Sequence, residues 1–537
     1  MKMKRKIKIL LVILCTISIV IILASVGIAK GMLRITDIYA NRIDPALGIN
    51  DRASRLIINQ VYDPLLFPDT QGNPLPYLAE SWETSSDGLV WTFHIRPGVK
   101  FHSGNELTAE DVKFSMDRLL TIGEGNAYLF LPYVSETEAI DKYTVAFHMQ
   151  KTFGPFLSTL PLFPIVDKEL VIANIENTGL YGDMGDYGKE FLLKNDAGSG
   201  PYKIKEYSAG EFFLLEKNPN YWLDMDPDAP DEVKIIATTE PVAVRTMMAR
   251  RELEITDKWQ SSESLEALSK IEGVKVASFN MSDVYFLEMH TRKPPTDDIH
   301  FRKAMAYAFD YEAAVKLFPG ASLAKGPTST KLPGTDPSIF YYQRDLDKAR
   351  AELQKSKYYG QLDKYPVELH CASEIKDEEK VGMLFMSNMD EIGITVNVKN
   401  LPWLSMFEES GNIETSPHIF TIINPAPYPE AGSQLVRYHS NQAASAIQNE
   451  WLLDPLFDKM VEESEGIVNK ADRFLKYGEI EKYIIDLCPT IFVDEPPQRR
   501  AYQADYVDWP NARGEAIPVA GYEIIARLIK VYPEKIK

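Results

Sequence analysis

Apolar and polar side chains alternate in one early segment of the chain. Trp91, Phe93 and Ile95 are apolar, and the residues between them are polar. A period of two is typical of a strand with one buried face. Pro97 and Gly98 end the pattern, because these residue types favour turns. The pattern predicts a strand over residues 91–96, with a second short strand near residues 99–102.

Other segments repeat their apolar residues every three or four positions, which is typical of helices with one buried face. A first helix is expected after Thr108, where Asp111 can complete a capping box. A second is expected to open at Asp297 and Asp298, and a third lies near the end of the chain. Their buried faces would hold, in order, Val112, Met116, Leu119 and Leu120; Phe301, Met305, Ala308 and Phe309; and Phe474, Tyr477, Ile480 and Ile484. Strand and helix patterns alternate along the chain, which predicts an α/β protein with sheets covered by helices.

Composition and charge exclude several classes of protein. The chain has 537 residues, 45% of them hydrophobic, with 58 basic and 77 acidic residues. This composition does not fit a disordered tail, a collagen-like fibre or a disulfide-dense miniprotein. Residues 1–30 hold six basic residues and no acidic one, so the remainder carries 52 basic against 77 acidic residues, a net charge of −25. Phosphates of nucleic acid repel such a body, and no nucleic-acid partner is expected.

The amino terminus predicts the compartment. Residues 1–8 are basic, and the 21 residues of 9–29 carry no charge. A bilayer span needs about 20 apolar residues, whereas a secretory signal has an apolar core of roughly 7–15. We therefore expect a cytoplasmic segment at 1–8 and a membrane anchor at 9–29, with a cleaved signal sequence ending at Ala29 as the alternative. The basic flank places residues 30–537 outside the cytoplasm, at the cell surface or in the periplasm.

The sequence contains three cysteines. Cys15 follows Val12–Leu14, which lacks the small residue that lipid attachment requires, so an ordinary cysteine in an apolar segment is expected. Cys371 and Cys488 can form a disulfide in an oxidising compartment or remain as buried free thiols. The sequence leaves both alternatives open.

Motifs that carry catalysis or metal binding are missing from the sequence. It has no nucleophile elbow, phosphate-binding loop, zinc-protease motif or dinucleotide fingerprint, and no two histidines lie four residues apart. Asp224, Asp226 and Asp228 resemble the start of a calcium loop, but Ala229 and Ile235 occupy the positions of the required glycine and glutamate. We predict no catalytic residue, no metal site and no cofactor, and therefore not an enzyme.

A series of motifs resembles the family 5 extracellular solute-binding proteins, the oligopeptide-, dipeptide- and nickel-type receptors of ABC importers. The resemblance covers essentially all of residues 34–537, and the order of the motifs makes it specific. The motifs are the run from Tyr62 to Leu120, GSGPYKI at 198–204, NPNYW at 218–222, HTRKPPTDDIHFRKAMAYAFDYEAAV at 290–315 and LPGTDP at 332–337.

The resemblance implies a two-lobed fold of the periplasmic-binding-protein type (class II, cluster C) with a small extra domain inserted in lobe one. By analogy, lobe one comprises residues 31–66, 196–284 and 506–537, the inserted domain 67–195, and lobe two 285–505. It also implies a monomer that closes on a solute and delivers it to ABC permease subunits with cytoplasmic ATPases. Closure follows because the ligand has a higher affinity for the closed state.

The resemblance also implies residues that bind the ligand. Trp403 matches a tryptophan that lines the cleft of peptide-binding relatives. The family pattern Trp-x-Ala-Asp-Tyr, whose aspartate holds the α-ammonium group of a peptide, falls on residues 424–428, so Asn424 replaces its tryptophan, Pro427 its aspartate, and Tyr428 is kept. Glu430 is expected to face solvent. Because an ammonium group without a counter-charge is costly to bury, a neutral ligand such as an oligosaccharide or a blocked peptide is expected.

Three further residues complete the predicted ligand set. Trp259 follows a segment that faces the cleft in relatives, Tyr285 lies at the crossing between the lobes, and His439 falls on a loop that faces the cleft in relatives. For Trp259 and Tyr285, packing in the core is the alternative interpretation. A nickel chelate also stays possible as ligand, because a relative can hold a metal through a bound chelator.

Two other functions compete with that of an importer receptor. An anchored extracellular hydrolase would need a nucleophile and a base, for which the sequence offers no motif. A sensor that passes ligand occupancy to a membrane receptor kinase, without transport, has the same sequence features as the importer receptor.

Overall fold

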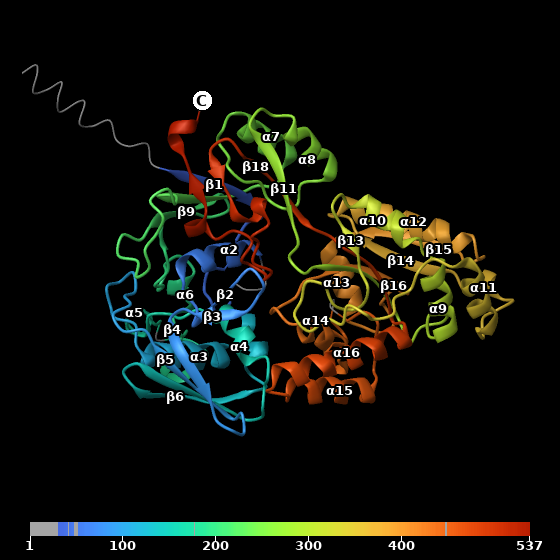
Figure 1. Cartoon of the computed structure of the whole chain (residues 1–537), viewed down its shortest axis with the longest axis horizontal. Coiled ribbons are helices and arrows are strands. Elements are labelled where there is room, and N and C mark those ends of the chain that lie inside the picture. Colours follow the sequence, from blue (N-terminus) through green and yellow to red (C-terminus); the bar gives the residue numbers. More distant parts are fainter. Residues whose placement is uncertain (1–30, 41, 48–51, 177, 446–447, 537) are drawn as a thin grey trace, which may run out of the picture.

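The computed structural model describes residues 31–40, 42–47, 52–176, 178–445 and 448–536. Figure 1 shows these residues as two bodies that face each other across strands β11 and β18. Lobe one, as we use the term below, consists of residues 31–279 and 498–536, and lobe two consists of residues 284–495. Helices and strands alternate in both, so the α/β class and the two-lobed fold expected from the sequence are confirmed.

The principal sheet of lobe one has the strand order β1-β10-β9-β8 within the described residues. Its strands are β1 (Met32–Asp37), β10 (Glu232–Ala237), β9 (Phe212–Lys217) and β8 (Tyr202–Ser208). β1 pairs parallel with β10, and the remaining pairs are antiparallel. Helix α2 (Arg52–Val61) ends against the turn before β8, where a Cβ atom on Gly198 would lie 2.0 Å from the carbonyl oxygen of Val61. Only glycine allows this close approach of two backbone segments.

The inserted segment carries a second sheet of order β4-β5-β7-β6 within the described residues. It contains β4 (Ala79–Thr84), β5 (Val90–Ile95), β7 (Thr144–Met149) and β6 (Val134–Asp141), and helix α3 (Ala109–Ile122) packs on it. The predicted strand is β5, with its apolar residues buried, and the predicted capping box of Thr108 and Asp111 begins α3. Both predictions are confirmed. The short strand expected at 99–102 is wrong, because this segment forms a turn with an isolated bridge from Lys100 to Glu106.

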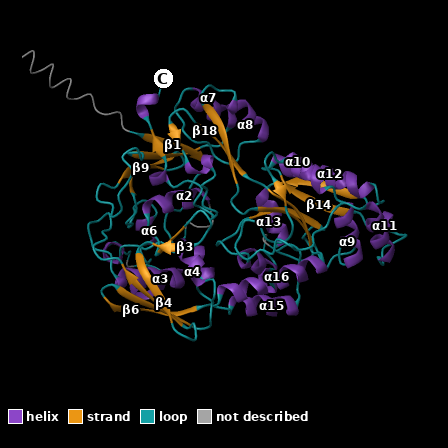
Figure 2. Cartoon of the chain, viewed as in Figure 1, coloured by secondary structure: helices purple, strands orange, loops and turns teal. Residues whose placement is uncertain are grey.

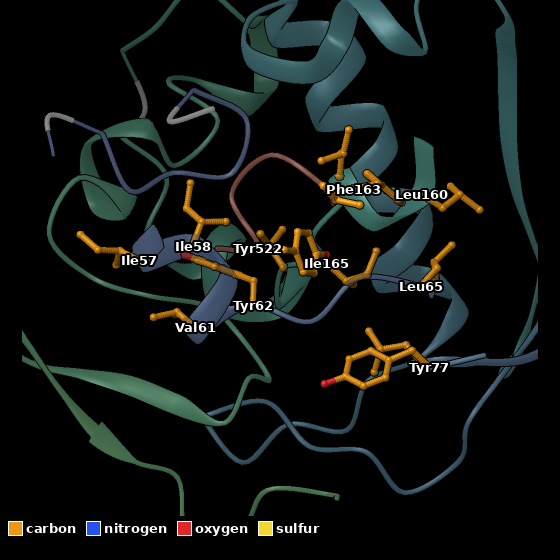
Figure 3. Packing of buried hydrophobic residues seen from close by; sticks show 14 of the residues in the cluster. Ile57, Ile58, Val61, Tyr62, Leu65, Tyr77, Leu160, Phe163, Ile165 and Tyr522 are labelled. Carbon is orange, nitrogen blue, oxygen red and sulfur yellow. The ribbon is translucent and has the colours of Figure 1, made fainter. Parts of the chain in front are cut away.

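Lobe one and its inserted segment share one apolar core. Ile57, Ile58 and Val61 of α2 belong to the same cluster as Leu160 and Phe163 of the inserted segment, and Tyr522 joins it from the end of the chain (Figure 3). The inserted segment therefore packs as a continuation of lobe one.

Lobe two contains a mixed sheet of order β13-β17-β12-β16-β14-β15 within the described residues. The strands are β13 (Ser322–Leu323), β17 (Thr490–Glu495), β12 (Val284–Met289), β16 (Ile419–Asn424), β14 (Val367–Ala372) and β15 (Val396–Leu401). Figure 2 shows α10 (Tyr311–Leu317) and α12 (Lys376–Asp390) along this sheet, with α15 (Pro455–Glu465) and α16 (Lys470–Leu487) at the other end of the lobe, beside α4 (Phe156–Thr159). A separate apolar core fills lobe two.

The two remaining helix predictions are confirmed in lobe two. Asp298 caps α9 (Ile299–Ala308) by accepting a hydrogen bond from the backbone N–H of Phe301. The third predicted helix is α16, in which Tyr477, Ile480 and Ile484 are buried. The other main helices are α5 (Lys168–Ala173), α6 (Lys189–Leu192), α7 (Pro241–Ala249), α8 (Ser262–Ser269), α11 (Leu346–Lys355), α13 (Trp403–Ser410) and α14 (Gly432–Leu435).

Two segments cross between the lobes. β11 (Val274–Phe279) leads into β12, and β17 leads into β18 (Gln498–Gln503) through Pro496 and Pro497. β18 pairs antiparallel with β11, and Ala501 packs in an apolar cluster with α7 and α8. Residues 498–505, assigned by analogy to lobe two, therefore lie with lobe one. Short ribbons β2 (Leu66–Pro68) with β3 (Pro74–Pro76), and β19 (Val507–Asp508) with β20 (Lys530–Val531), complete the strands.

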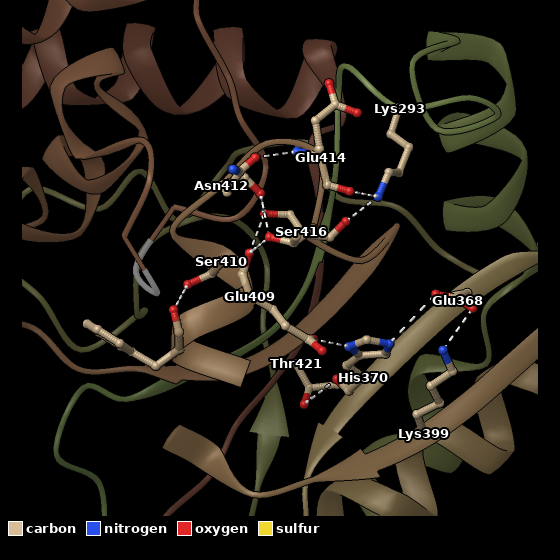
Figure 4. Close-up of polar contacts among 12 residues, drawn as sticks. Lys293, Glu368, His370, Lys399, Glu409, Ser410, Asn412, Glu414, Ser416 and Thr421 are labelled. Carbon is tan, nitrogen blue, oxygen red and sulfur yellow. Dashed lines mark hydrogen bonds and ion pairs between the residues drawn. The ribbon is translucent and has the colours of Figure 1, made fainter. Parts of the chain in front are cut away.

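A polar network secures the edge of the sheet in lobe two (Figure 4). His370 of β14 lies 2.9 Å from Glu409 of α13, and Lys399 of β15 forms an ion pair with Glu368. The Nζ of Lys293 donates to the carbonyl oxygen of Ser416. The contact between His370 and Glu409 attaches α13, whose first residue is Trp403, to the sheet.

Cys371 and Cys488 are both buried free thiols. Of the two alternatives that the sequence left open, the structure shows the free thiols. Cys15, the predicted cytoplasmic segment 1–8 and the predicted anchor 9–29 lie outside the described residues.

Within the part of the chain that the structure describes, no helix combines the length and the apolar character needed to cross a membrane.

Candidate functional site

A cavity of about 750 Å³ lies between the two lobes and reaches the crossing segments. Lobe one contributes Lys258, Trp259, Gln260, Ser261, Ser262, Leu265 and Arg499, among others. Lobe two contributes Phe318, Ala372, Glu374, Asp377, Glu378, Trp403, Ile422 and Ile423, and the crossing segments contribute Asp283, Pro496 and Pro497, next to Gln498 of lobe one. A volume of this size fits a small solute.

A buried carboxylate shapes the wall of the cavity in lobe one. Asp257 accepts hydrogen bonds from the backbone N–H of Trp259 at 2.8 Å and from Nε2 of Gln260 at 2.9 Å. Burial raises the pKa of Asp257, and these two donors oppose that rise. The contacts hold the loop so that the ring of Trp259 stays 43% exposed, with the ammonium group of Lys258 at 4.3 Å from the ring centre. The loop thus presents an aromatic face and a cation to the cavity.

The rest of this wall comes from α8 and β18. Ser261 caps α8 by accepting a hydrogen bond from the backbone N–H of Ser264 at 3.1 Å. Arg499 of β18 donates from Nη1 to Oγ of Ser262, also at 3.1 Å. The guanidinium group of Arg499 is half-buried, and burial lowers its pKa. It brings a second cation to the wall of lobe one.

The wall in lobe two is built where α12 begins, and it carries carboxylates. Both oxygens of Glu374 accept from the backbone N–H of Trp403 at 3.1 Å, at the start of α13. Asp377 receives the ammonium group of Lys380 at 2.8 Å. Glu378 is only 1% exposed, and its Oε2 accepts from the backbone N–H of Ala372 at 3.0 Å and from Oγ1 of Thr421 at 2.6 Å. Burial raises the pKa of Glu378 to about 7.

The cavity is therefore polarised from one lobe to the other. Among the lining residues, the cations Lys258 and Arg499 belong to lobe one, and the carboxylates of Glu374, Asp377 and Glu378 belong to lobe two, while Asp283 lies on a crossing segment between them. Opposite charges on facing walls attract opposite ends of a dipolar ligand, and each wall repels the wrong end. The arrangement binds and orients a solute. Within the described residues, no cluster of three or more histidine, cysteine or acidic side chains is placed to share a metal ion.

One set of contacts, the rim, joins the lobes beside the cavity. Oγ of Ser262 lies 3.5 Å from Asp377, and Nζ of Lys380 lies 3.2 Å from Glu263. Both pairs connect α8 with α12. The side chain of Glu263 is 71% exposed and that of Lys380 is 42% exposed, so water screens their attraction.

A second set of contacts, the seam, joins the inserted segment to residues 428–473 of lobe two. Ser158 donates to Glu430 at 2.9 Å, and the backbone N–H of Gly154 donates to the carbonyl oxygen of Glu465 at 2.7 Å. A Cβ atom on Gly154 would lie 2.0 Å from the carbonyl oxygen of Ile467. Unlike the rim, this contact is buried and closely packed.

The structure brings two of the predicted ligand residues to the cavity, Trp259 and Trp403. Tyr285 is fully buried in β12 and packs edge-on against Phe318 with ring centres 5.6 Å apart. Asn424 is buried at the end of β16, where its carbonyl oxygen accepts from Nε2 of Gln434 at 3.0 Å. Neither residue is among those that line the cavity.

The other two predicted ligand residues lie outside the cavity lining as well. Tyr428 is buried and packs with the apolar core of lobe one. His439 lies within 3.8 Å of Asp458 and 3.5 Å of Glu462, next to α15.

The expectation that Glu430 faces solvent is wrong. Glu430 is only 2% exposed and forms a bidentate ion pair with Arg473, at 2.8 and 3.0 Å. Tyr477 donates a further hydrogen bond at 3.1 Å. Both carboxylate oxygens of Glu430 are thus paired with Arg473 in the seam. For this reason Glu430, although close to Pro427 in the sequence, does not replace the missing carboxylate.

Sequence reasoning missed the charged residues of the cavity. Glu374, Asp377 and Glu378 lie in the run SEIKDEEK, whose density of charge is typical of an exposed start of a helix. The available signal was their position directly after the buried strand at 367–372, since residues that follow such strands gather at one edge of a sheet.

Comparisons with known proteins agree with this architecture. The model of the family described as bacterial extracellular solute-binding proteins, family 5 middle, matches residues 73–445. A probable D,D-dipeptide-binding periplasmic protein, DdpA of Escherichia coli (strain K12), is 27% identical over 428 residues, 78% of each chain. Di/tripeptide-binding protein 2 of Pseudomonas aeruginosa (strain UCBPP-PA14) is 26% identical over 455 residues, 79% of this chain and 81% of the relative.

Solved structures share the fold. The ABC transporter substrate-binding protein CtaP of Listeria monocytogenes has a TM-score of 0.81 at 20% identity, covering 94% of this chain and 99% of that one. NikA of Brucella suis, in complex with Fe(III)-EDTA, has a TM-score of 0.78 at 18% identity, covering 93% and 99%. Together with the family match over more than half of its length, these findings show that the chain belongs to the family 5 bacterial extracellular solute-binding proteins.

Proposed function

We propose that this chain is the receptor of an ABC importer that captures a short, peptide-like zwitterion between its lobes and delivers it to a membrane permease. The observation that carries the proposal is the polarity of the cavity, with Lys258 and Arg499 on one wall and Glu374, Asp377 and Glu378 on the other. A solute with an ammonium group at one end and a carboxylate at the other matches both walls at once. The relatives named for dipeptides support the same class of ligand.

A neutral ligand was expected because Pro427 stands in place of a carboxylate. That expectation considered Pro427 and Glu430, and the cavity contains carboxylates from α12 and the loop before it. The exposed rings of Trp259 and Trp403 still favour a second candidate, an oligosaccharide, because rings stack on the apolar faces of sugars. The two candidates differ in the charge of the ligand. An experiment can change this charge while the shape of the ligand stays nearly the same.

The test uses a panel of ligands matched in shape. Free dipeptides, the same dipeptides N-acetylated or C-amidated, and neutral oligosaccharides are compared by thermal shift and then by calorimetry. We expect a free dipeptide to bind best, with both blocked forms weaker by about tenfold or more, since a hydrogen bond to a charged group is worth about 1.5–3 kcal/mol. Equal binding of free and blocked forms, or binding of oligosaccharides alone, contradicts the zwitterion. Mass spectrometry of small molecules released on denaturation gives an independent identification.

We further propose that the protein acts as a monomer that closes on its ligand. The exposed pairs of the rim support this motion, because contacts of this kind form and break at little cost. Small-angle scattering should show the mass of one chain and a smaller radius of gyration when a saturating ligand from the panel is added. An unchanged radius, or the mass of a dimer, contradicts this part of the proposal.

Attachment to the cell membrane through residues 9–29 is also a proposal, supported by the length of the uncharged segment. Intact mass measured on protein extracted from membranes should include the complete amino terminus. A mature chain that starts at Lys30 would identify the segment as a cleaved signal.

A further inference from the structure

Glu378 differs from the other two carboxylates of the lobe-two wall because it is buried and pairs with no cation among the described side chains. Asp377 is neutralised by Lys380 at 2.8 Å. Glu374 is exposed to water and caps α13. Glu378 receives only neutral donors, the backbone N–H of Ala372 and the hydroxyl of Thr421, and both bind the same oxygen, Oε2. Among the side chains that the structure describes, no lysine or arginine forms an ion pair with it.

The groups packed around Glu378 that the structure describes supply no positive charge. β12 brings the phenol of Tyr285, and β14 brings the thiol of Cys371, both of which interact with the charge of Glu378. The loop before α12 brings Glu374, whose like charge further raises the pKa of Glu378. The cations Lys258 and Arg499 belong to the opposite wall of the cavity. A buried carboxylate without a counter-charge is costly, and the open side of this one is the ligand cavity.

We propose that Glu378 is the residue that selects the ligand, by pairing with a primary ammonium group that enters the cavity. This inference rests on the proposed function and deepens it by assigning the ammonium end of the ligand to one side chain. The ammonium group of the ligand supplies the positive charge that pairs with Glu378. A carboxylate in the seam, Glu430, shows the alternative, since there the fold itself supplies Arg473.

The binding step includes a transfer of a proton. In the empty cavity, a carboxyl group with a pKa of about 7 is protonated in about half of the molecules at pH 7. When the ammonium group docks, the carboxylate form is stabilised, and the proton of the protonated fraction passes to the solvent while the ligand keeps its own. No bond other than this O–H bond breaks.

The affinity for an amine should therefore decrease as the pH falls. As the pH falls below 7, a growing fraction of Glu378 must first lose a proton, so the affinity for an amine falls by up to about tenfold per pH unit. The α-amino group of a peptide titrates near 7.7–8.0, so it remains charged over this range. A neutral ligand that does not pair with Glu378 has no such dependence.

The experiment compares Glu378→Gln with the wild type, using the free dipeptide panel and its N-acetylated counterparts. Glutamine keeps an oxygen that accepts from Ala372 and Thr421, so the start of α12 is preserved, but it carries no charge. Calorimetry at pH 7 in two buffers of different ionisation enthalpy counts the protons released. We expect the wild type to release about half a proton at pH 7 and the variant none. We expect the variant to bind free dipeptides about ten- to a hundredfold more weakly.

Glu379→Gln is the matched control, since it removes a charge at the next position of α12, which is exposed and does not line the cavity. It should keep the release of protons and most of the affinity.

Two failures are distinguishable. If no free dipeptide binds the wild type, the proposed ligand class is wrong, and this inference falls with it. If free dipeptides bind but Glu378→Gln keeps the wild-type affinity, pH dependence and proton release, the ligand class stands and the role of Glu378 is overturned. A variant that loses binding of free and acetylated dipeptides alike also overturns it, because the effect is then not on the ammonium group.

Discussion

Glu430 and Glu378 are buried to nearly the same extent, 2% and 1% exposed, yet their surroundings differ completely. Glu430, in the seam, holds Arg473 through two hydrogen bonds and receives hydroxyls from Ser158 and Tyr477. Glu378, at the cavity, receives two neutral donors on one oxygen. Burial alone therefore does not identify a ligand-binding acid in this protein. Glu378 is distinguished by having no counter-charge among the described side chains and by lining the cavity.

The difference follows from the energetics of buried charge. Two ions buried together offset their loss of hydration by mutual attraction when the geometry is good, as in the bidentate pair of the seam. A single buried carboxylate has no such compensation, so its pKa rises and its burial lowers the stability of the protein. Such a loss of stability is common at sites used for binding. Mutation of the ion pair in the seam should therefore lower the stability of the protein, and mutation of Glu378 at the cavity should raise it.

The largest expected effect comes from removing the cation of the seam. Arg473→Met leaves Glu430 as an unpaired buried carboxylate, which costs about 3–5 kcal/mol of unfolding free energy. Urea denaturation at pH 7.5 measures the loss. The double variant with Glu430→Gln should recover a large part of it, because the uncompensated charge is then gone. If the single variant unfolds like the wild type, the seam does not depend on this ion pair.

The opposite effect is expected at Glu378, and its sign depends on pH. The folded pKa of about 7 exceeds the ordinary value of 4.5. Between pH 4.5 and pH 7, this carboxyl group is therefore protonated in the folded state and deprotonated in the unfolded chain. The stability contributed by this group is therefore highest below pH 4.5 and decreases as the pH rises to 7, by roughly 3 kcal/mol. Glu378→Gln removes this dependence.

Urea unfolding of wild type and Glu378→Gln at pH 5 and pH 8, both without ligand, measures the effect. The variant should gain stability relative to the wild type as the pH increases. Other buried acids, such as Glu481 with its pKa raised to about 7, contribute equally to both proteins and cancel in the difference. A difference that stays constant with pH would show that Glu378 is compensated in a way that its contacts do not reveal.

The sequence predicted those features that depend on neighbouring residues. The strand at 90–95 and the helices at 109–122, 299–308 and 470–487 follow from a local period and from caps within three residues. The burial of Glu430 could not be predicted in this way, because its partners Arg473 and Ser158 lie 43 and 272 positions away. Trp259 and Trp403 were found through the motifs of the family.

The cavity acids were missed for a related reason. In a single sequence, Glu378 cannot be distinguished from the exposed acids beside it, since its burial depends on β14 and β16, which pair with each other across about 50 positions. The same limit applies to the polarity of the cavity, whose two walls belong to separate lobes. Local patterns give the elements of this fold, and long-range contacts decide which charges remain unpaired.

The smallest expected effect is at the rim, where Glu263 and Lys380 join the lobes beside the cavity. Exposed pairs of this kind contribute about 0.2–1 kcal/mol and are screened by salt. Glu263→Gln should therefore weaken ligand binding by less than about fivefold at low ionic strength and have no measurable effect in 0.5 M salt. Glu266→Gln is the matched control, because Glu266 lies on the same helix and pairs with Lys270 of its own lobe at 2.8 Å. A tenfold loss that persists in high salt would mean that the rim holds the lobes closed.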